Sequence, residues 1–240
     1  MKVSESVMFT LVWENSIAQL YVHSQPVIDS EPAVLVCFGN TCDFHSGMQS
    51  WRDSPGWAAN AVLCVKDRTM DQATYRLAAS DHSDSGCRDW TDSDTEYSSS
   101  VSDGVVQHLL HSCPSRYWVL AGLSGGCVTT AVLSRQMQSL GLVVLGLVAD
   151  SGVPGSGVVD DSLPVAVYRF ADPCEYWNGG EVAVEWTRRG YDVVFDEPYN
   201  EPKDLEGYPV PGSCHASYLE RNELRKCVRW FWWNSHMWGK

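Results

Sequence analysis

Continuous apolar runs recur along the chain and predict strands that are buried on both faces of a sheet. Such runs are typical of parallel sheets, whose strands are covered by helices on either side. They occur at Ala33–Phe38, Ala61–Val65, Arg116–Ala121, Leu142–Ala149, Val165–Phe170 and Asp192–Phe195. Ahead of them, Val7–Trp13 and Ile17–His23 flank the polar residues 14–16, which predicts an N-terminal β-hairpin.

Between these runs, apolar residues recur at the three- and four-residue spacing of amphipathic helices. Stripes of this kind begin at Val101, Val128, Val182 and Leu224. The third ends at Arg188-Arg189-Gly190, where cations and then a glycine suit a helix C-terminus. Strands that alternate with helices predict an α/β fold with a doubly wound, mostly parallel sheet. With 240 residues, 44% of them apolar, we expect a single domain over residues 1–240.

Charge and hydropathy limit the partners that the protein can have. A net charge of −13 argues against nucleic acid or an anionic membrane surface as a partner. The longest apolar run, Gly141–Ala149, is too short to span a bilayer. No targeting segment is recognised either, so we expect a cytoplasmic protein without stable membrane insertion.

The nine cysteines are odd in number and scattered, without a C-x-x-C pair. Cys37, Cys64 and Cys127 fall inside apolar patterns, where a reduced thiol behaves as a small hydrophobic side chain. We therefore expect a reducing compartment, no metal site and no cofactor. A disulfide between Cys42 and Cys87, both in predicted loops, stays open.

Gly122-Leu123-Ser124-Gly125-Gly126 is the only Gly-x-Ser-x-Gly in the sequence, and it lies between a predicted strand and a predicted helix. In that context the motif forms a nucleophile elbow, a sharp turn that presents the serine at the end of the strand. The turn holds its serine in a strained backbone conformation, and a side chain at Gly122 or Gly126 would collide across it. We predict Ser124 as a catalytic nucleophile.

A serine hydroxyl needs a base at neutral pH. His215 comes after the last strand and directly before the final helix, which returns it to the carboxyl edge of the sheet, where ligands bind in such folds. We predict it as the base. The other histidines are His23, His45, His82, His108, His111 and His236, the last of them in a Trp-rich tail that we expect to fray.

The base in turn needs a carboxylate that fixes its tautomer. Asp172, just past the strand at Val165–Phe170, is the first choice. Asp150, past the preceding strand, is its rival, and Asp196 ranks third. Asp172 could instead cap a helix, and Asp150 could be a turn residue.

The order Ser124, Asp172, His215 resembles the catalytic triad of the α/β-hydrolase superfamily. Finer features resemble its phospholipase/carboxylesterase and dienelactone-hydrolase branch, namely Leu147–Gly152 followed by Pro154, Pro164–Pro173 with its Asp-Pro, and Arg189–Phe195. The chain departs from that branch at Phe38-Gly39, Arg169-Phe170 and Cys214-His215, where the branch has His-Gly, His-Gly and often Gly-His.

The resemblance also implies an oxyanion hole made of two backbone N–H groups. One belongs to Gly125, directly after the nucleophile; the other is implied for Asn40, with Thr41 as its nearest competitor. Dienelactone hydrolases use a cysteine nucleophile, but here Cys127 lies one turn into the helix, where we expect it to pack.

This machinery implies a serine hydrolase that cleaves a small or modest-sized carboxylic ester, or a thioester, through an acyl-enzyme intermediate. The expected partner is thus a small-molecule ester substrate. Two alternatives stay open. One is a catalytically inactive relative that binds a partner; the other is a lyase or acyltransferase on the same scaffold.

Overall fold

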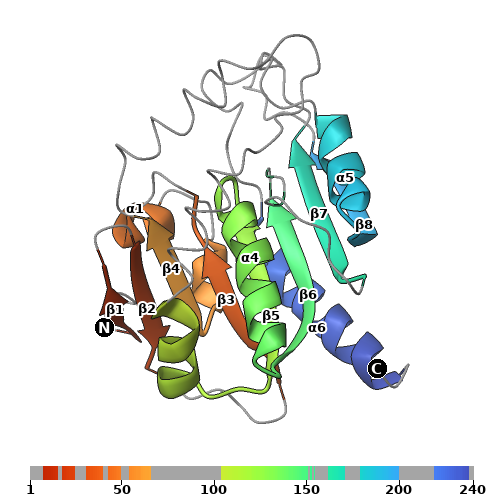
Figure 1. Ribbon diagram of the computed structural model, residues 1–240. Coiled ribbons are helices and arrows are strands. Elements are labelled where there is room, and N and C mark those ends of the chain that lie inside the picture. Colours follow the sequence, from red (N-terminus) through yellow and green to blue (C-terminus); the bar gives the residue numbers. More distant parts are fainter. Residues whose placement is uncertain are drawn as a thin grey trace, which may run out of the picture.

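The strands form one mixed sheet at the centre of the molecule (Figure 1). The computed structural model describes residues 8–15, 18–24, 31–39, 43–49, 54–65, 104–150, 152, 154, 162–170, 179–199 and 219–237. Within these ranges the sheet has eight strands in the order β1-β2-β4-β3-β5-β6-β7-β8. Their bounds are Phe9–Glu14, Ala18–His23, Ala33–Cys37, Ala61–Val65, Tyr117–Leu123, Val143–Asp150, Pro164–Phe170 and Asp192–Tyr199, numbered β1 to β8.

The strand directions confirm the predicted fold class. β1 and β2 form an antiparallel hairpin, and β2 pairs antiparallel with β4. From β4 through β3, β5, β6 and β7 to β8, every pairing is parallel. The carboxyl ends of these six strands therefore meet at one edge of the sheet, and that edge is where the predicted site residues were expected.

Helices cover both faces of the sheet (Figure 1). The helix at residues 104–112, α4 (Gly126–Ser139) and α5 (Gly179–Arg188) pack on one face. α1 (Phe44–Gln49) and α6 (Arg221–Met237) pack on the other, with the short helix η2 (Pro55–Ala58) beside α6. The central strands carry apolar residues on both sides because each side faces a helical layer.

The predicted helix stripes are the buried faces of the observed helices. Val105, Val106 and Leu109 are buried in the first helix. In α6, Leu224, Cys227 and Phe231 are buried. α5 ends as expected, because Gly190 has a φ of +88° and donates its N–H to the carbonyl of Thr187.

Two expectations need correction, and two short helices were missed. His236 is not in a frayed tail, since α6 continues to Met237 and the His236 ring contacts Trp232. Asp196 does not lie past a strand, because β8 continues to Tyr199 and pairs Asp196 with Val167. The short helices α1 and η2 were not predicted, since neither is long enough to show a helical period. Among the described residues, no helix is both long and apolar enough to cross a bilayer.

Candidate active site

Ser124 occupies a strained turn between the end of β5 and the start of α4. Its φ is +54°, and it is the one non-glycine residue with a positive φ in the described part of the chain. A residue with a Cβ pays roughly 1–3 kcal/mol for such a conformation, so the surrounding structure must enforce it. The turn is fixed by two backbone hydrogen bonds: the Ser124 N–H donates to Asp150 at 2.8 Å, and the Ser124 carbonyl accepts from Cys127 at 3.0 Å. This backbone has the geometry of a nucleophile elbow.

The two outer glycines of the motif are required by close backbone contacts. A Cβ on Gly122 would lie 2.6 Å from the Cα of Cys127, on the far side of the turn. A Cβ on Gly126 would overlap the carbonyl oxygen of Cys37, at the end of β3. The contact at Gly122 lies across the turn, as the sequence predicted. The contact at Gly126 is instead with β3, so the first turn of α4 lies directly against that strand.

Two further glycines outside the motif, Gly39 and Gly152, lie in close contact with the elbow. A Cβ on Gly39 would lie 2.9 Å from the Leu123 carbonyl oxygen and 3.1 Å from the Ser124 Cβ. A Cβ on Gly152 would overlap the carbonyl oxygen of Ser124. No role was predicted for either glycine in the packing of the elbow. The signal available in sequence was only that each glycine follows shortly after a predicted strand, and each lies two residues past the end of the observed strand.

Asp150 is the last residue of β6, and its side chain is 1% exposed. Its carbonyl accepts the Ser124 N–H, and its carboxylate Oδ2 accepts the backbone N–H of Leu219 at 2.9 Å. Leu219 lies two residues before the start of α6. One residue thus ties the elbow to the beginning of the C-terminal helix. Asp150 is part of β6, so it is not a turn residue. Its carboxylate has a structural role, because it holds the backbone of Leu219.

Cys127 is fully buried behind the elbow and behaves as a packing residue. Its thiol donates to the carbonyl of Gly122 at 3.2 Å and lies 3.7 Å from the carbonyl of Asp150. Burial raises the pKa of the Cys127 thiol well above its usual value, and the nearby Asp150 carboxylate raises it further. A buried thiol that stays protonated is a poor nucleophile. Cys37 and Cys64 are buried as well and form no disulfide within the described residues, as their apolar surroundings predicted.

The predicted site residues fall into two groups. Ser124 and Gly125 are described, and Gly125 caps the N-terminus of α4. Its N–H has no hydrogen-bond partner within the described ranges, as is usual for the first amides of a helix. The other predicted site residues, Asn40, Asp172 and His215, lie outside the described residues. So do Thr41, the alternative to Asn40, and His82. Cys42 and Cys87, for which a disulfide was left open, lie outside them too.

Five other histidines are described, and four of them have aromatic neighbours. His23 on β2 meets the ring of Phe9, and His45 on α1 meets that of Phe44. His108 lies 6.2 Å from Trp13, measured between ring centroids. The Nδ1 atom of His236 lies 2.8 Å from the carbonyl oxygen of Trp232. His111 is exposed on the 104–112 helix. These surroundings are those of packing and surface residues.

A cavity of about 230 Å³ lies between β7, β8 and α6, and Tyr168, Phe195 and Trp230 are among its lining residues. Ser124 does not line it, so this cavity is separate from the turn at Ser124. No group of three or more His, Cys, Asp or Glu side chains within the described ranges is arranged to hold a metal ion.

No protein-family model and no curated protein sequence matches the chain. Solved structures do match it. An inhibited esterase B from Lactobacillus rhamnosis has a TM-score of 0.51 at 12% identity and covers 92% of this chain and 82% of its own. A sugar hydrolase from Lactococcus lactis has a TM-score of 0.50 at 13% identity, with 95% and 98% covered.

A phospholipase/carboxylesterase from Dyadobacter fermentans also matches, with a TM-score of 0.46 at 12% identity over 90% of this chain and 100% of its own. At such low identity the first two likenesses show the fold alone. With the strand order and the elbow, they show that the chain has the α/β-hydrolase fold, as the sequence resemblance implied.

The buried thiol generates a prediction about reactivity. At pH 8, iodoacetamide should leave Cys127 unmodified in the folded protein, because the raised pKa and full burial keep the thiol protonated and out of reach. Peptide mapping by mass spectrometry measures the modification. The same peptide alkylated in 6 M guanidinium chloride is the control, and rapid alkylation of Cys127 in the native state would contradict the packing role.

Proposed function

We propose that the protein is a serine hydrolase that cleaves a small or modest-sized carboxylic ester, or a thioester. The observation that carries the proposal is the positive φ of Ser124 at the carboxyl end of a central parallel strand. A strained serine of this kind persists only where the structure enforces it, and such strain concentrates at functional sites. The esterase and hydrolase names of the structural neighbours agree with this class of reaction.

In the proposed reaction, the Ser124 hydroxyl attacks the ester carbonyl while a histidine takes its proton. The carbonyl oxygen becomes negative and is stabilised by backbone N–H groups. The Gly125 N–H suits this role because it lies at the N-terminus of α4, where the helix dipole favours an anion. The intermediate then collapses: the bond to the leaving oxygen or sulfur breaks, the histidine returns the proton to the departing alcohol or thiol, and the acyl group stays on Ser124. Water, deprotonated by the same histidine, then hydrolyses the acyl-enzyme, which releases the carboxylic acid and restores the serine. We propose Asn40 as the second donor, since its neighbour Gly39 lies against the Ser124 side chain.

The short stretch of chain between His215 and Leu219 supports His215 as the base. It precedes Leu219 by four residues, and four extended residues span at most about 14 Å. Leu219 is hydrogen-bonded to the carboxylate of Asp150, whose carbonyl accepts the Ser124 N–H. The bond from Asp150 to Leu219 therefore sets an upper limit on how far the covalent chain can carry position 215 from the elbow, and this limit is compatible with the proposed role of His215.

Strand spacing supports Asp172 as the acid. β7 ends at Phe170 and lies two strands from β5, so its carboxyl end is about 10 Å from that of β5. That gap suits an imidazole held between the serine and the carboxylate. Asp150 lies only one strand from β5, about 5 Å, and its carboxylate already accepts the Leu219 N–H. We therefore propose Asp172, and Asp150 as a structural residue.

Ser124→Ala should lower kcat/KM for p-nitrophenyl esters by on the order of 10⁴-fold, because it removes the nucleophile. The half-buried Ser124 side chain carries no core packing, so the thermal unfolding midpoint should stay unchanged. Ser139→Ala, the same substitution at the exposed end of α4, is the matched control and should keep wild-type activity. An esterase activity that survives in Ser124→Ala would refute the proposed nucleophile. If the wild-type protein is inactive on esters and thioesters of all chain lengths, the proposal that it is a hydrolase is refuted.

The pH dependence of kcat/KM in two asparagine variants tests which aspartate is the catalytic acid. The histidine must be neutral to accept the serine proton, so kcat/KM should rise through its pKa. A buried carboxylate next to the imidazole raises that pKa above its ordinary value of about 6.5, because it stabilises the charged form. Asp172→Asn should therefore cut kcat/KM by up to about 10⁴-fold and move the acidic limb to lower pH.

Asp150→Asn should do neither, since its amide oxygen can still accept the Leu219 N–H. Full pH–rate profiles of both variants are the measurement. A large loss with a shifted limb in Asp150→Asn, and a mild loss in Asp172→Asn, would reverse the assignment.

A further inference from the structure

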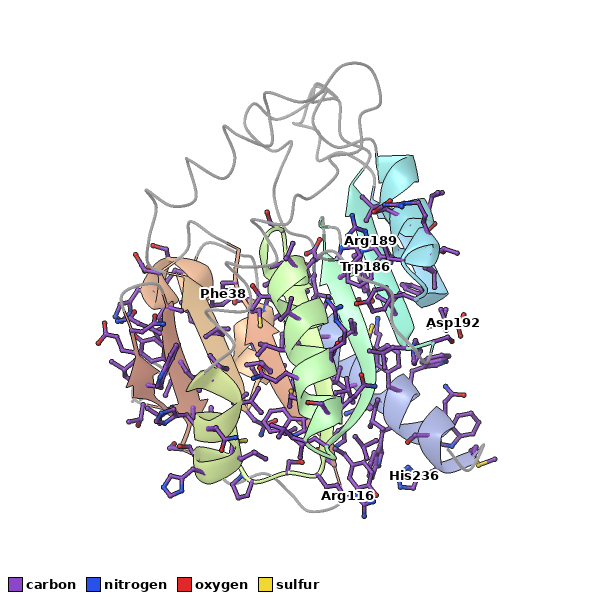
Figure 2. All side chains as sticks on the ribbon, in the orientation of Figure 1. Phe38, Arg116, Trp186, Arg189, Asp192 and His236 are labelled. Atoms are coloured by element: carbon purple, nitrogen blue, oxygen red, sulfur yellow. The ribbon has the colours of Figure 1, made fainter. Side chains whose placement is uncertain are left out.

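Trp186 connects α5 to the backbone beside the proposed nucleophile. Its side chain is fully buried, and its indole N–H donates to the carbonyl of Gly152 at 2.8 Å (Figure 2). The two residues are 34 positions apart in the sequence. An indole N–H in a core needs a partner, so this bond fixes Trp186 and Gly152 relative to each other.

Gly152 in turn lies in close contact with the elbow. It lies so close to the Ser124 carbonyl oxygen that a Cβ would overlap that atom, and the same Cβ would be 2.6 Å from the Cys127 sulfur. Two residues earlier, the Asp150 carbonyl accepts the Ser124 N–H at 2.8 Å. The last residue of β6 therefore contacts Ser124 on its N–H side, and the backbone just after β6 contacts it on its carbonyl side. A shift of that backbone would be transmitted to the strained φ of the serine.

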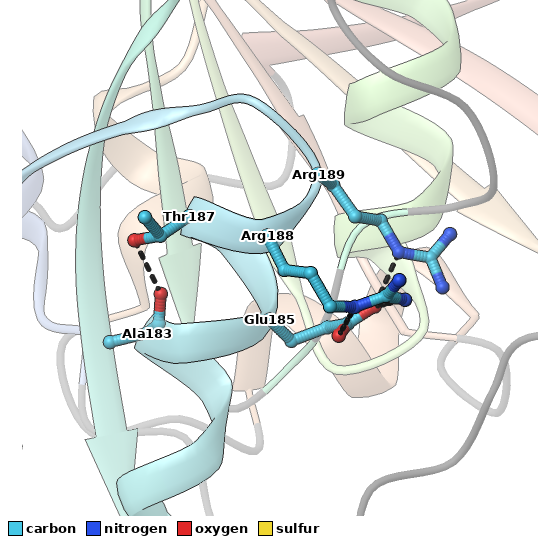
Figure 3. A network of polar contacts seen from close by, with 5 residues as sticks. All are labelled: Ala183, Glu185, Thr187, Arg188 and Arg189. Atoms are coloured by element: carbon cyan, nitrogen blue, oxygen red, sulfur yellow. Dashed lines mark hydrogen bonds and ion pairs between the residues drawn. The ribbon is translucent and has the colours of Figure 1, made fainter.

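An aromatic contact and ion pairs hold α5 in place. The Trp186 ring packs edge-on against Tyr191, with ring centroids 4.7 Å apart. At the C-terminal end of the helix, the buried Glu185 and Arg189 side chains form an ion pair, and Arg188 adds a second bond to Glu185 at 2.7 Å (Figure 3). Burial alone would raise the pKa of Glu185, but the two arginines lower it overall, so the pair stays charged at neutral pH.

We propose that Trp186 is a positioning residue for Ser124. Its indole N–H holds the Gly152 backbone against the elbow, and this contact keeps the serine in its strained, reactive conformation. The inference rests on the proposed function, because it concerns how fast Ser124 reacts. Trp186 lies in α5 and is not proposed to touch substrate, so we expect its replacement to change kcat and not KM.

Trp186→Phe removes the indole donor and keeps an aromatic ring in the core. Trp118→Phe is the matched control: Trp118 is also fully buried, and its indole N–H donates to the Ser115 carbonyl at 2.9 Å, at the amino end of β5. Both variants should lower the thermal unfolding midpoint. We expect only Trp186→Phe to lower kcat for a p-nitrophenyl ester and the rate constant of fluorophosphonate labelling, each by about tenfold, with KM unchanged within about twofold.

The end point of labelling separates positioning from partial unfolding. Trp186→Phe should still be labelled to one equivalent, only more slowly, because every molecule is folded but its serine is less well held. If Trp186→Phe reacts at the wild-type rate, or if both tryptophan variants slow equally, the proposal is overturned. A loss of end point without a loss of rate constant overturns it too.

A glycine pair tests the same contact without changing the tryptophan. Gly152→Ala should push on the Ser124 carbonyl and lower kcat by a similar factor. Gly141→Ala is strained by a φ of +81° but touches nothing within 4 Å, so it should lower the unfolding midpoint and leave kcat unchanged. Equal kcat values for the two alanine variants would contradict the contact. A wild-type protein that is not labelled at all would instead refute the proposed function, and this inference with it.

Discussion

The close approach of α4 to the end of β3 is the constraint on which the rest of the site depends. The chain must turn from β5 into α4 beside the Cys37 carbonyl, and only a glycine at position 126 leaves room for that. The turn forces Ser124 to a φ of +54°. Backbone contacts on several sides enforce this strain and hold the serine at the carboxyl edge of the sheet.

Asp150 shows how one residue can serve the fold and the proposed chemistry together. Its carbonyl holds the elbow, and its carboxylate holds the backbone that leads into α6. A buried carboxylate is costly unless it is hydrogen-bonded, and the Leu219 N–H supplies that partner. The same bond anchors Leu219, four residues after His215 in the sequence. It also explains why a carboxylate at this position need not be the catalytic acid.

Much of this architecture could be predicted from the sequence, because it depends on local patterns. Continuous apolar runs predicted the buried parallel strands, and the glycines at 122 and 126 predicted a tight turn at Ser124. Contacts between distant parts of the chain could not be predicted. The bond from Trp186 to Gly152 and the bridge from Asp150 to Leu219 join residues 34 and 69 positions apart, and no periodicity encodes them. Asp196 was misplaced because β8 continues through polar residues, where the apolar run that predicted the strand had ended.

The most direct test of the account is to locate the reactive residue chemically. The wild-type protein is treated with a fluorophosphonate, digested and mapped by mass spectrometry. The account predicts one phosphonyl adduct, on Ser124, with none on the neighbouring Thr129, Thr130 or Ser134, whose side chains are buried in α4. An unlabelled protein, or an adduct on another residue with Ser124 unmodified, would contradict it.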